Sequence, residues 1–399
     1  MTPSLVYVIG TCDTKGPELH YAADLIRLAG VQAVLVDVST GPGQFEADIT
    51  AAEVAGFHPA GFAAVLGLTD RGQAVTAMSE ALTRFILSRD DVAGILGMGG
   101  SGNSTIVTAA MRALPIGVPK LMVSTLASGN VAPFVGGSDI TMLHSVSDIA
   151  GLNAISRKVI GNAAHAMVGM VAHPVPETRE AKRPVGLTMF GVTTPCVTQI
   201  RAAIDHDNEC FVFHATGIGG QCMEKLIDSG YLSAVLDITT TEVADHLCGG
   251  TLPCTDDRFG AVIRTKIPYV GSVGAVDMVN FGPRATVPQT YAARLFHIHN
   301  ASVTLMRTTA AENTAIGQWI VAKLNQMHGP VRFLLPLRGV SALDAKGQPF
   351  EDARADQALF TAIRDGWHPG PNRQLIEVDD HINSPHFAAA AVAAFRDIT

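Results

Sequence analysis

The sequence is poor in charge, and the charge it carries is slightly acidic. Of its 399 residues 16% are charged, and 28 Lys and Arg stand against 36 Asp and Glu. Because the chain has no basic stripe and no run of Lys and Arg, nucleic acid and anionic membrane surfaces are unfavourable partners. We expect a protein that binds neither nucleic acid nor membranes.

Cysteines and long apolar runs are also scarce. The six cysteines show no CxxC spacing, which argues against a disulfide framework and a structural zinc site. The longest apolar stretch, residues 160–175, is interrupted by His165 and His173 and is shorter than the ~20 residues of a membrane span. The chain starts with MTPSLVYVIG, which has neither the basic region nor the cleavage site of a secretory signal. These absences lead us to expect a cytoplasmic protein.

Apolar residues are abundant, and they follow a regular order. Short apolar runs alternate with amphipathic stretches, which is typical of a parallel sheet covered by helices on both faces. In the first half we expect helices over about 18–29, over about 72–88 and from Ser104 onward, and strands at residues 5–10, 31–38, 92–98 and 120–125. After a charged, proline-containing segment without periodicity, the pattern restarts with strands at residues 185–191, 209–217, 234–240, 267–274, 331–336 and 374–378.

The two halves resemble one another in architecture. A strand that runs into GTCDTK (10–15) has a counterpart that runs into GVTTPC (191–196), and ILGMGGSGNST (95–105) has one in VLDITTTEVAD (235–245). The sequence therefore predicts an α/β fold of two Rossmann-like, open parallel-sheet subdomains with a cleft between them. Their expected bounds are residues 1–175 and 185–399, joined by a linker over 176–184.

The 39 glycines are concentrated where strands pass into helices, and the densest group is GMGGSGNST at residues 97–105. A loop there directs several backbone N–H groups and a helix N-terminus to one point, which suits phosphate. Although this loop satisfies GxGxxG, the strand that follows it ends without an acidic residue for a ribose, so a dinucleotide site is weakly supported. The alternative is a tight strand-to-helix turn without a ligand.

Loops at the carboxyl ends of neighbouring strands converge in such folds. We therefore expect GTCDTK, GMGGSGNST and STLASGN to share one crevice, in which Lys15 meets a phosphate and Asp13 a metal or a hydroxyl group. Helix capping and a solvated ion pair are the alternatives for Asp13 and Lys15. The candidate nucleotide- and phosphate-binding residues are Asp13, Thr14, Lys15, Gly97, Gly99, Gly100, Ser101, Gly102, Asn103, Ser104, Thr125 and Ser128.

The second half offers titratable groups near a strand end. Glu242 and His246 are four residues apart, so on a helix they share a face and suit acid–base chemistry, and Asp237 lies just upstream. These three are the candidate catalytic residues. HExxH is absent, and the metal ligands stay unassigned. The candidate substrate-cleft residues are His214, Thr216, Gly217, Gly219, Gly220, Asp277 and Arg307.

Taken together, these segments resemble the tobamovirus-resistance (Tm-like) ATP-binding family, which has many bacterial members of uncharacterised function. The matching segments run from GTCDTKGPEL through GMGGSGNST, FHATGIGGQCME, LDITTTEVADHL and VGAVDMVNFG to SALDAKGQPFEDA, in the family's order. The resemblance implies two Rossmann-like subdomains, binding of ATP with Mg²⁺, and self-association into a homodimer or higher homo-oligomer.

We expect a nucleotide-binding protein whose phosphate site is the loop at residues 97–105, as in a metabolic enzyme that acts on a small carboxylate or a phosphorylated metabolite in the cleft. Two alternatives stay open. One is an ATP-independent lyase or hydrolase of a small organic acid that uses Glu242 and His246. The other is a nucleotide-sensing module without catalysis.

Overall fold

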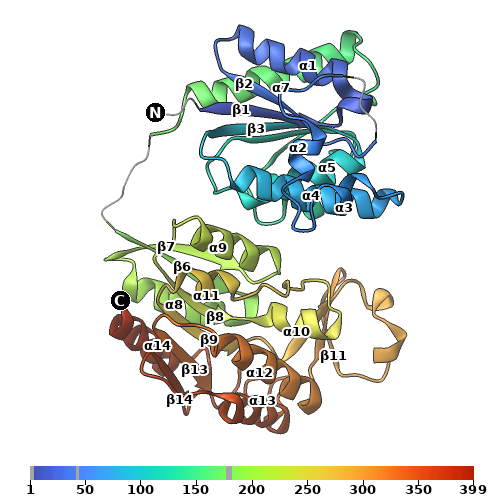
Figure 1. Ribbon diagram of the computed structural model, residues 1–399. Coiled ribbons are helices and arrows are strands. Elements are labelled where there is room, and N and C mark those ends of the chain that lie inside the picture. Colours follow the sequence, from blue (N-terminus) through green and yellow to red (C-terminus); the bar gives the residue numbers. More distant parts are fainter. Residues whose placement is uncertain (1–3, 42–44, 177–181) are drawn as a thin grey trace. The chain divides into compact units, whose positions relative to one another are not determined.

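The structure is a computed structural model that describes residues 4–41, 45–176 and 182–399. The chain divides into two compact units, Met1–Thr178 and Arg179–Thr399, each with its own sheet and core (Figure 1). The predicted linker, 176–184, falls partly on residues 177–181, which lie outside the described residues, and the first strand of the second unit begins at Arg183. The cleft predicted between the units stays a prediction.

The first unit alternates strands and helices from its start. Its elements are β1 (Leu5–Gly10), α1 (Cys12–Leu28), β2 (Ala33–Asp37), α2 (Ala51–Ala55), α3 (Ala63–Leu66), α4 (Arg71–Leu87), β3 (Val92–Gly99), α5 (Ser101–Ala113), β4 (Lys120–Ser124), α6 (Ala132–Val135), β5 (Thr141–His144) and α7 (Ala154–Ala172).

The five strands of the first unit form a parallel sheet in the order β2-β1-β3-β4-β5. Figure 1 shows α1 and α7 on one face of this sheet and α4 and α5 on the other. Side chains of β1 alternate between the two layers: Val6 and Val8 pack with α1 and α7, whereas Tyr7 and Ile9 pack with α4 and α5. Both faces are buried, which explains the continuous apolar strand sequences.

The second unit repeats this plan with one more strand in its parallel sheet. Its elements are β6 (Arg183–Met189), α8 (Thr194–Ile204), β7 (Asn208–His214), α9 (Ile218–Asp228), β8 (Ala234–Thr239), α10 (Thr241–Cys248), α11 (Gly260–Thr265), β9 (Tyr269–Gly274), β10 (Met278–Phe281), β11 (Phe296–Asn300), β12 (Val303–Arg307), α12 (Ala310–Leu324), β13 (Val331–Pro336), α13 (Ala353–Gly366), β14 (Arg373–Val378) and α14 (Pro385–Ile398).

The six-stranded parallel sheet of the second unit has the order β7-β6-β8-β9-β13-β14. If the strands are counted within each parallel sheet, both sheets begin with the order 2-1-3-4-5, so the two units share a topology. The predicted correspondences hold: GTCDTK follows β1 as GVTTPC follows β6, and the segments at 95–105 and 235–245 both join the third strand to its helix. The prediction of two Rossmann-like α/β subdomains is confirmed.

Both faces of the second sheet are also covered. Ala234, Leu236 and Ile238 of β8 pack with α8 and α14, whereas Val235 packs with the helices of the opposite face. A small antiparallel sheet, β10-β12-β11, is inserted between β9 and α12. The sequence did not predict this sheet, because its three strands are only four or five residues long.

Two helices begin earlier than predicted. α1 begins at Cys12 rather than near Glu18, and Lys15 inside it has non-helical backbone angles (φ −129°, ψ 15°). Pro17 disfavours helical geometry before it, so the first turn is kinked away from the rest of α1 and lacks its periodicity. α5 begins at Ser101 rather than Ser104, because the glycine-rich sequence conceals the helical first turn.

Across the described ranges, no helix combines the length and the apolar character that a bilayer span requires.

Candidate functional site

A pocket of about 520 Å³ lies at the carboxyl ends of β1 and β3 in the first unit. These neighbouring strands are followed by helices on opposite faces of the sheet, α1 and α5, which makes the crevice between them the topological switch point of the fold. Ligands of open parallel sheets bind at such points. The pocket is lined by Thr11, Asp13, Thr14, Lys15, Thr40, Gly41, Leu68, Thr69, Arg71, Ala74, Val75, Gly100, Ser101, Gly102, Asn103, Ile106 and Asp148.

The N-terminus of α5 opens into this pocket. Gly100 is the N-cap residue and, having no side chain, leaves the first N–H groups of the helix without a side-chain cap. Gly100, Ser101, Gly102 and Asn103 all line the pocket. The helix dipole and these N–H groups therefore favour an anion here.

The four glycines around the start of α5 have two different roles. A Cβ at Gly97 would lie 2.6 Å from Val107 Cγ1, and a Cβ at Gly99, where φ is +152°, would lie 2.6 Å from Asn103 Nδ2. Gly97 and Gly99 are thus required for packing and for the turn. By contrast, a Cβ at Gly100 would approach nothing closer than 3.8 Å, and one at Gly102 nothing closer than 3.7 Å. These two glycines leave space on the side of the pocket.

Two basic side chains line the pocket, Lys15 and Arg71. Within the described residues neither has an ion-pair partner, so both charges are available to a ligand. Lys15 was predicted, but Arg71 was not. It is the first residue of α4, after the N-cap Asp70. The sequence did contain a signal that could have identified Arg71. A helix that precedes a parallel strand starts at the carboxyl edge of the sheet, so the start of the helix predicted over 72–88 is expected to lie beside the crevice.

The pocket also has an apolar side, formed by Leu68, Ala74, Val75 and Ile106. The first three lie at the start of α4 and just before it, and Ile106 lies on α5. The pocket therefore combines a positively charged end of a helix with a wall of aliphatic side chains, as small-molecule sites do.

Seven of the twelve predicted phosphate-binding residues line the pocket: Asp13, Thr14, Lys15, Gly100, Ser101, Gly102 and Asn103. Ser104 is fully buried and bonds to Ser124 Oγ at 2.7 Å, so it ties α5 to β4. Thr125 lies beside Gly100, with its Oγ1 3.8 Å from where a Cβ of that glycine would stand. Ser128 is exposed and lies outside the lining.

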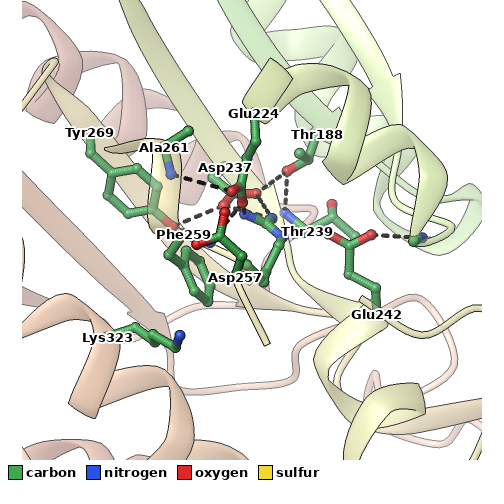
Figure 2. Close-up of polar contacts among 12 residues, drawn as sticks. Thr188, Glu224, Asp237, Thr239, Glu242, Asp257, Phe259, Ala261, Tyr269 and Lys323 are labelled. Carbon is green, nitrogen blue, oxygen red and sulfur yellow. Dashed lines mark hydrogen bonds and ion pairs between the residues drawn. The ribbon is translucent and has the colours of Figure 1, made fainter. Parts of the chain in front are cut away.

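In the second unit, Asp237 and Glu242 come together on Arg258, which was not predicted. The Arg258 guanidinium donates to both oxygens of Asp237 at 2.8 Å, to Glu224 at 2.9 Å and to Glu242. Figure 2 shows Asp237 at the centre of this cluster, with the hydroxyl groups of Thr188 (2.7 Å) and Tyr269 (3.0 Å) directed at it. Arg258 is 3% exposed, and Asp237 and Glu242 are fully buried.

The charge of this cluster is unbalanced, because one guanidinium faces three carboxyl groups. Burial raises the pKa of Glu224 and of Glu242, although Arg258 opposes the shift. Burial also raises the pKa of the Tyr269 hydroxyl well above its usual range, and Asp237 adds to this. The cluster joins α9, β8, α10 and the loop before α11, and it has the properties of a buried network that specifies packing.

His246 has different partners from Glu242. Its Nε2 lies 3.1 Å from the exposed Asp256, and its ring lies against Trp319, with centroids 5.8 Å apart. The predicted catalytic pair of Glu242 and His246 therefore shares one helix, α10, without sharing partners.

The predicted substrate-cleft glycines also serve packing. Gly217 has φ +77° and donates its N–H to Glu242 at 2.7 Å, while Cβ atoms at Gly219 and Gly220 would overlap the His214 carbonyl and the Glu242 carboxylate. The His214 ring stacks on Phe190 with centroids 5.1 Å apart. Thr216 bonds to the His214 carbonyl at 3.3 Å.

Arg307 and Asp277 belong to a second buried cluster. Arg307 is 4% exposed and donates to Asp344 at 2.9 Å and to Asp356 at 2.7 Å, while Asp277 accepts from Ser341 at 2.8 Å. The Arg307 guanidinium is therefore engaged by the protein.

The arrangement of His, Cys, Asp and Glu side chains limits the kind of metal site that the described residues can form. Across residues 4–41, 45–176 and 182–399, no group of three or more His, Cys, Asp and Glu side chains is arranged to hold a metal ion. A site made wholly of such ligands is therefore not present in the described part of the chain. Mg²⁺ does not need one, because it keeps several waters and takes only one or two carboxylates alongside phosphate oxygens.

Known proteins resemble this chain over nearly its full length. The "UPF0261 protein RA0729" of Rhizobium meliloti is 58% identical over 98% of both chains, and a UPF0261 protein of Clostridium tetani is 42% identical over 96% of both. The "ToMV resistance protein Tm-1(GCR237)" of Solanum lycopersicum is 41% identical over 99% of this chain and 56% of its own length. A solved Streptomyces glycosyltransferase complexed with thymidine diphosphate covers 67% of this chain and 81% of its own at 13% identity, but its TM-score of 0.19 carries no inference.

Two family models match the two units separately. The N-terminal domain of the uncharacterised protein family UPF0261 matches residues 4–176, and the C-terminal domain of that family matches residues 182–399. The predicted resemblance, which rested on the segments around the pocket and in the second unit, is confirmed by these matches and by the tomato relative. The chain belongs to the UPF0261 family.

Proposed function

We propose that the first unit binds a nucleoside polyphosphate, ATP in the first instance, in the pocket between β1 and β3. The observation that carries the proposal is the uncapped N-terminus of α5, which opens into a pocket that is also lined by Lys15 and Arg71, two cations without an ion-pair partner among the described residues. Backbone N–H groups at a helix start and unpaired basic side chains together suit a ligand with several negative charges.

The apolar side of the pocket supports a nucleotide rather than inorganic phosphate. Leu68, Val75 and Ile106 offer an apolar surface of the kind on which a base packs, and Val75 Cγ2 lies 3.7 Å from where a Cβ of Gly102 would stand. The volume of about 520 Å³ lies within the range of small-molecule sites. ATP is the nucleotide that the family resemblance implies. Its three phosphates match in number the three positive groups of the pocket, which are Lys15, Arg71 and the N-terminus of α5.

Calorimetric titration of the full chain with ATP, ADP, AMP and adenosine, in the presence of Mg²⁺, tests the proposal. We expect affinity to fall in that order, because each phosphate removed gives up contacts with α5, Lys15 or Arg71. Equal affinity for adenosine and ATP would show that the site recognises the nucleoside and not the phosphates. No binding of any of the four compounds at millimolar concentration would refute the proposal.

The further expectation of a metabolic enzyme acting on a small carboxylate or a phosphorylated metabolite stays a prediction. Incubating the protein with ATP and candidate acids, followed by product analysis, tests it. The buried Glu242, held by Arg258, is not needed for the proposed nucleotide site.

A further inference from the structure

An unpaired carboxylate lines the pocket of the first unit, in addition to its cations. Asp148 belongs to the loop that joins β5 to α7, is exposed to solvent and forms part of the pocket wall. Among the described residues its carboxylate has no hydrogen-bond or ion-pair partner. Because a negative group repels phosphate, Asp148 suits a part of the ligand that donates hydrogen bonds.

The loop that carries Asp148 is held at both ends. Before it, the Ser145 N–H donates to the Ser124 carbonyl at the end of β4, at 3.2 Å. After it, the Gly151 N–H donates to the carboxylate of Glu18 at 2.6 Å, and Glu18 is buried on α1. These bonds keep the loop beside α1, on whose side of the pocket Asp148 therefore lies.

The middle of the loop has an unusual backbone conformation. Val146 has a φ of +66°, and the Ser147 N–H donates to the Ser145 carbonyl at 2.8 Å, which closes a γ-turn around Val146. A β-branched residue adopts this conformation only where its surroundings impose it. The turn thus gives Asp148, two residues later, a defined position.

The acidic residue that would ordinarily bind a ribose is occupied by the protein. In open parallel sheets that residue follows the second strand, and here Asp37 ends β2. Its Oδ1 accepts from the N–H groups of Cys12 and Ser39, both at 2.9 Å, and from the Ser39 hydroxyl. Asp37 is 8% exposed and lies outside the pocket lining, so a ribose in this pocket needs another acceptor.

The other parts of a nucleotide have their own contacts in the proposed site. The phosphates face the start of α5 and the base faces the aliphatic side chains of α4 and α5, which leaves the ribose for the side of the pocket formed by α1 and the loop of Asp148. A ribose presents two neighbouring hydroxyl donors, and a carboxylate presents two acceptor oxygens. We infer that Asp148 accepts hydrogen bonds from the ribose hydroxyl groups and selects ribonucleotides over deoxyribonucleotides. This assignment rests on the proposed function.

Calorimetric titration of the full chain with ATP, 2′-deoxy-ATP and 3′-deoxy-ATP tests the assignment. The unchanged protein should bind the deoxynucleotides about tenfold or more weakly than ATP, because each lacks a hydrogen bond to a charged acceptor. Asp148→Ala should lower the affinity for ATP to that of the deoxynucleotides and leave theirs nearly unchanged. Equal affinities for the three nucleotides in the unchanged protein, or an equal loss for all three in Asp148→Ala, would overturn the assignment.

Asp90→Ala provides the matched control. Asp90 is also an exposed aspartate of the first unit, but it precedes the amino end of β3, at the opposite edge of the sheet. This variant should keep both the affinity for ATP and the preference for ATP over the deoxynucleotides. Thermal unfolding followed by circular dichroism checks that both variants are folded.

The amino group of adenine is the other donor of the ligand that a carboxylate can bind. ITP distinguishes the two, because its base carries an oxygen in place of that amino group. We expect Asp148→Ala to weaken ITP as much as it weakens ATP. A variant that binds ATP more weakly but ITP normally would show that Asp148 contacts the base, and the ribose assignment would be wrong.

Adenosine and 2′-deoxyadenosine separate this inference from the proposed function, because they carry no phosphate. If the unchanged protein prefers adenosine through Asp148 but binds ATP no better than adenosine, the ribose contact stands and the polyphosphate proposal fails. If ATP binds better than adenosine but deoxynucleotides bind as well as ribonucleotides, the polyphosphate proposal stands and the ribose contact is wrong. Binding of none of these compounds would refute both.

Discussion

The Nδ2 group of Asn103 donates a hydrogen bond to Thr11 Oγ1 across 3.1 Å, joining residues that are 92 positions apart in the sequence. Thr11 is the N-cap of α1 and Asn103 lies in the first turn of α5. The bond therefore links the two loops that flank the switch point of the first sheet. It gives the pocket a wall of fixed geometry, which favours binding because little ordering is left for the ligand to impose.

The first prediction concerns Arg71. Arg71→Ala should lower the affinity for ATP by about tenfold or more and leave that for adenosine nearly unchanged, because a charge-assisted bond to phosphate is lost. Calorimetry measures both affinities. Arg84→Ala is the control, since Arg84 lies on the same helix and pairs with Glu80 at 3.0 Å. An equal loss of affinity for adenosine and ATP would show that Arg71 shapes the pocket and does not bind the phosphates.

The second prediction concerns Gly100. Its φ of −86° suits any residue, and the Cβ of a larger side chain would have room, so Gly100→Val should fold normally. The side chain would nevertheless stand between a phosphate and the N–H groups of α5, and we expect ATP affinity to fall more than tenfold. Gly169→Val, at a helical glycine of α7 with nothing within 4 Å of its Cβ position, provides the control. Unchanged ATP binding in Gly100→Val would place the phosphates elsewhere.

The third prediction concerns the buried cluster of the second unit. Arg258→Met should destabilise that unit by about 3–5 kcal/mol, because it leaves the carboxyl groups of Glu224, Asp237 and Glu242 buried without their shared cation. Urea unfolding followed by circular dichroism measures the loss. Arg264→Ala removes an exposed arginine that pairs with Asp228 and Asp257, and it should cost less than about 1 kcal/mol. Similar losses in the two variants would contradict the account.

The fourth prediction is a pH dependence of stability in the second unit. Burial raises the pKa of Asp277 to about 6 and that of Asp344 to about 9, and it also raises that of Asp356. In the unfolded chain these carboxyl groups release their protons near pH 4, so at higher pH the folded state binds more protons than the unfolded one. Their contribution to stability is complete below that pH and is lost as the pH rises through the folded values.

We therefore expect the urea midpoint of the second unit to fall as the pH rises from about 4 to about 9, with the contribution of Asp277 lost by about pH 6 and that of Asp344 by about pH 9. Asp356→Asn should flatten this slope, because it removes one of the three carboxyl groups around Arg307 and keeps an oxygen to accept from it. A midpoint that is constant or rises over this range in the unchanged protein would be inconsistent with the burial of these carboxyl groups.

The sequence predicts most of the fold, because apolar strands buried on both faces leave a strong pattern. It also predicts seven residues of the pocket wall, since glycines and small polar residues at strand ends have a physical reason to gather there. Arg71 was not predicted because the prediction used only the loops that follow strands, whereas Arg71 begins the helix that precedes a strand. Arg258 could not be found in the same way: its partners come from α9, β8 and α10, and only the packed chain brings them to one guanidinium.

The second-unit candidates show a further limit of sequence reasoning. The spacing of Glu242 and His246 on α10 is helical, as predicted, but helical spacing does not tell which side chain faces the core. Glu242 is fully buried beside Arg258, whereas His246 meets the exposed Asp256.

The most direct test of nucleotide binding in the first unit is a crystal structure of the full chain with a non-hydrolysable ATP analogue and Mg²⁺. We predict phosphate density within hydrogen-bond distance of the backbone N–H groups of residues 101–103, with the Lys15 and Arg71 side chains directed at it. Analogue density at another place, with the pocket at the start of α5 holding only solvent, would contradict the account.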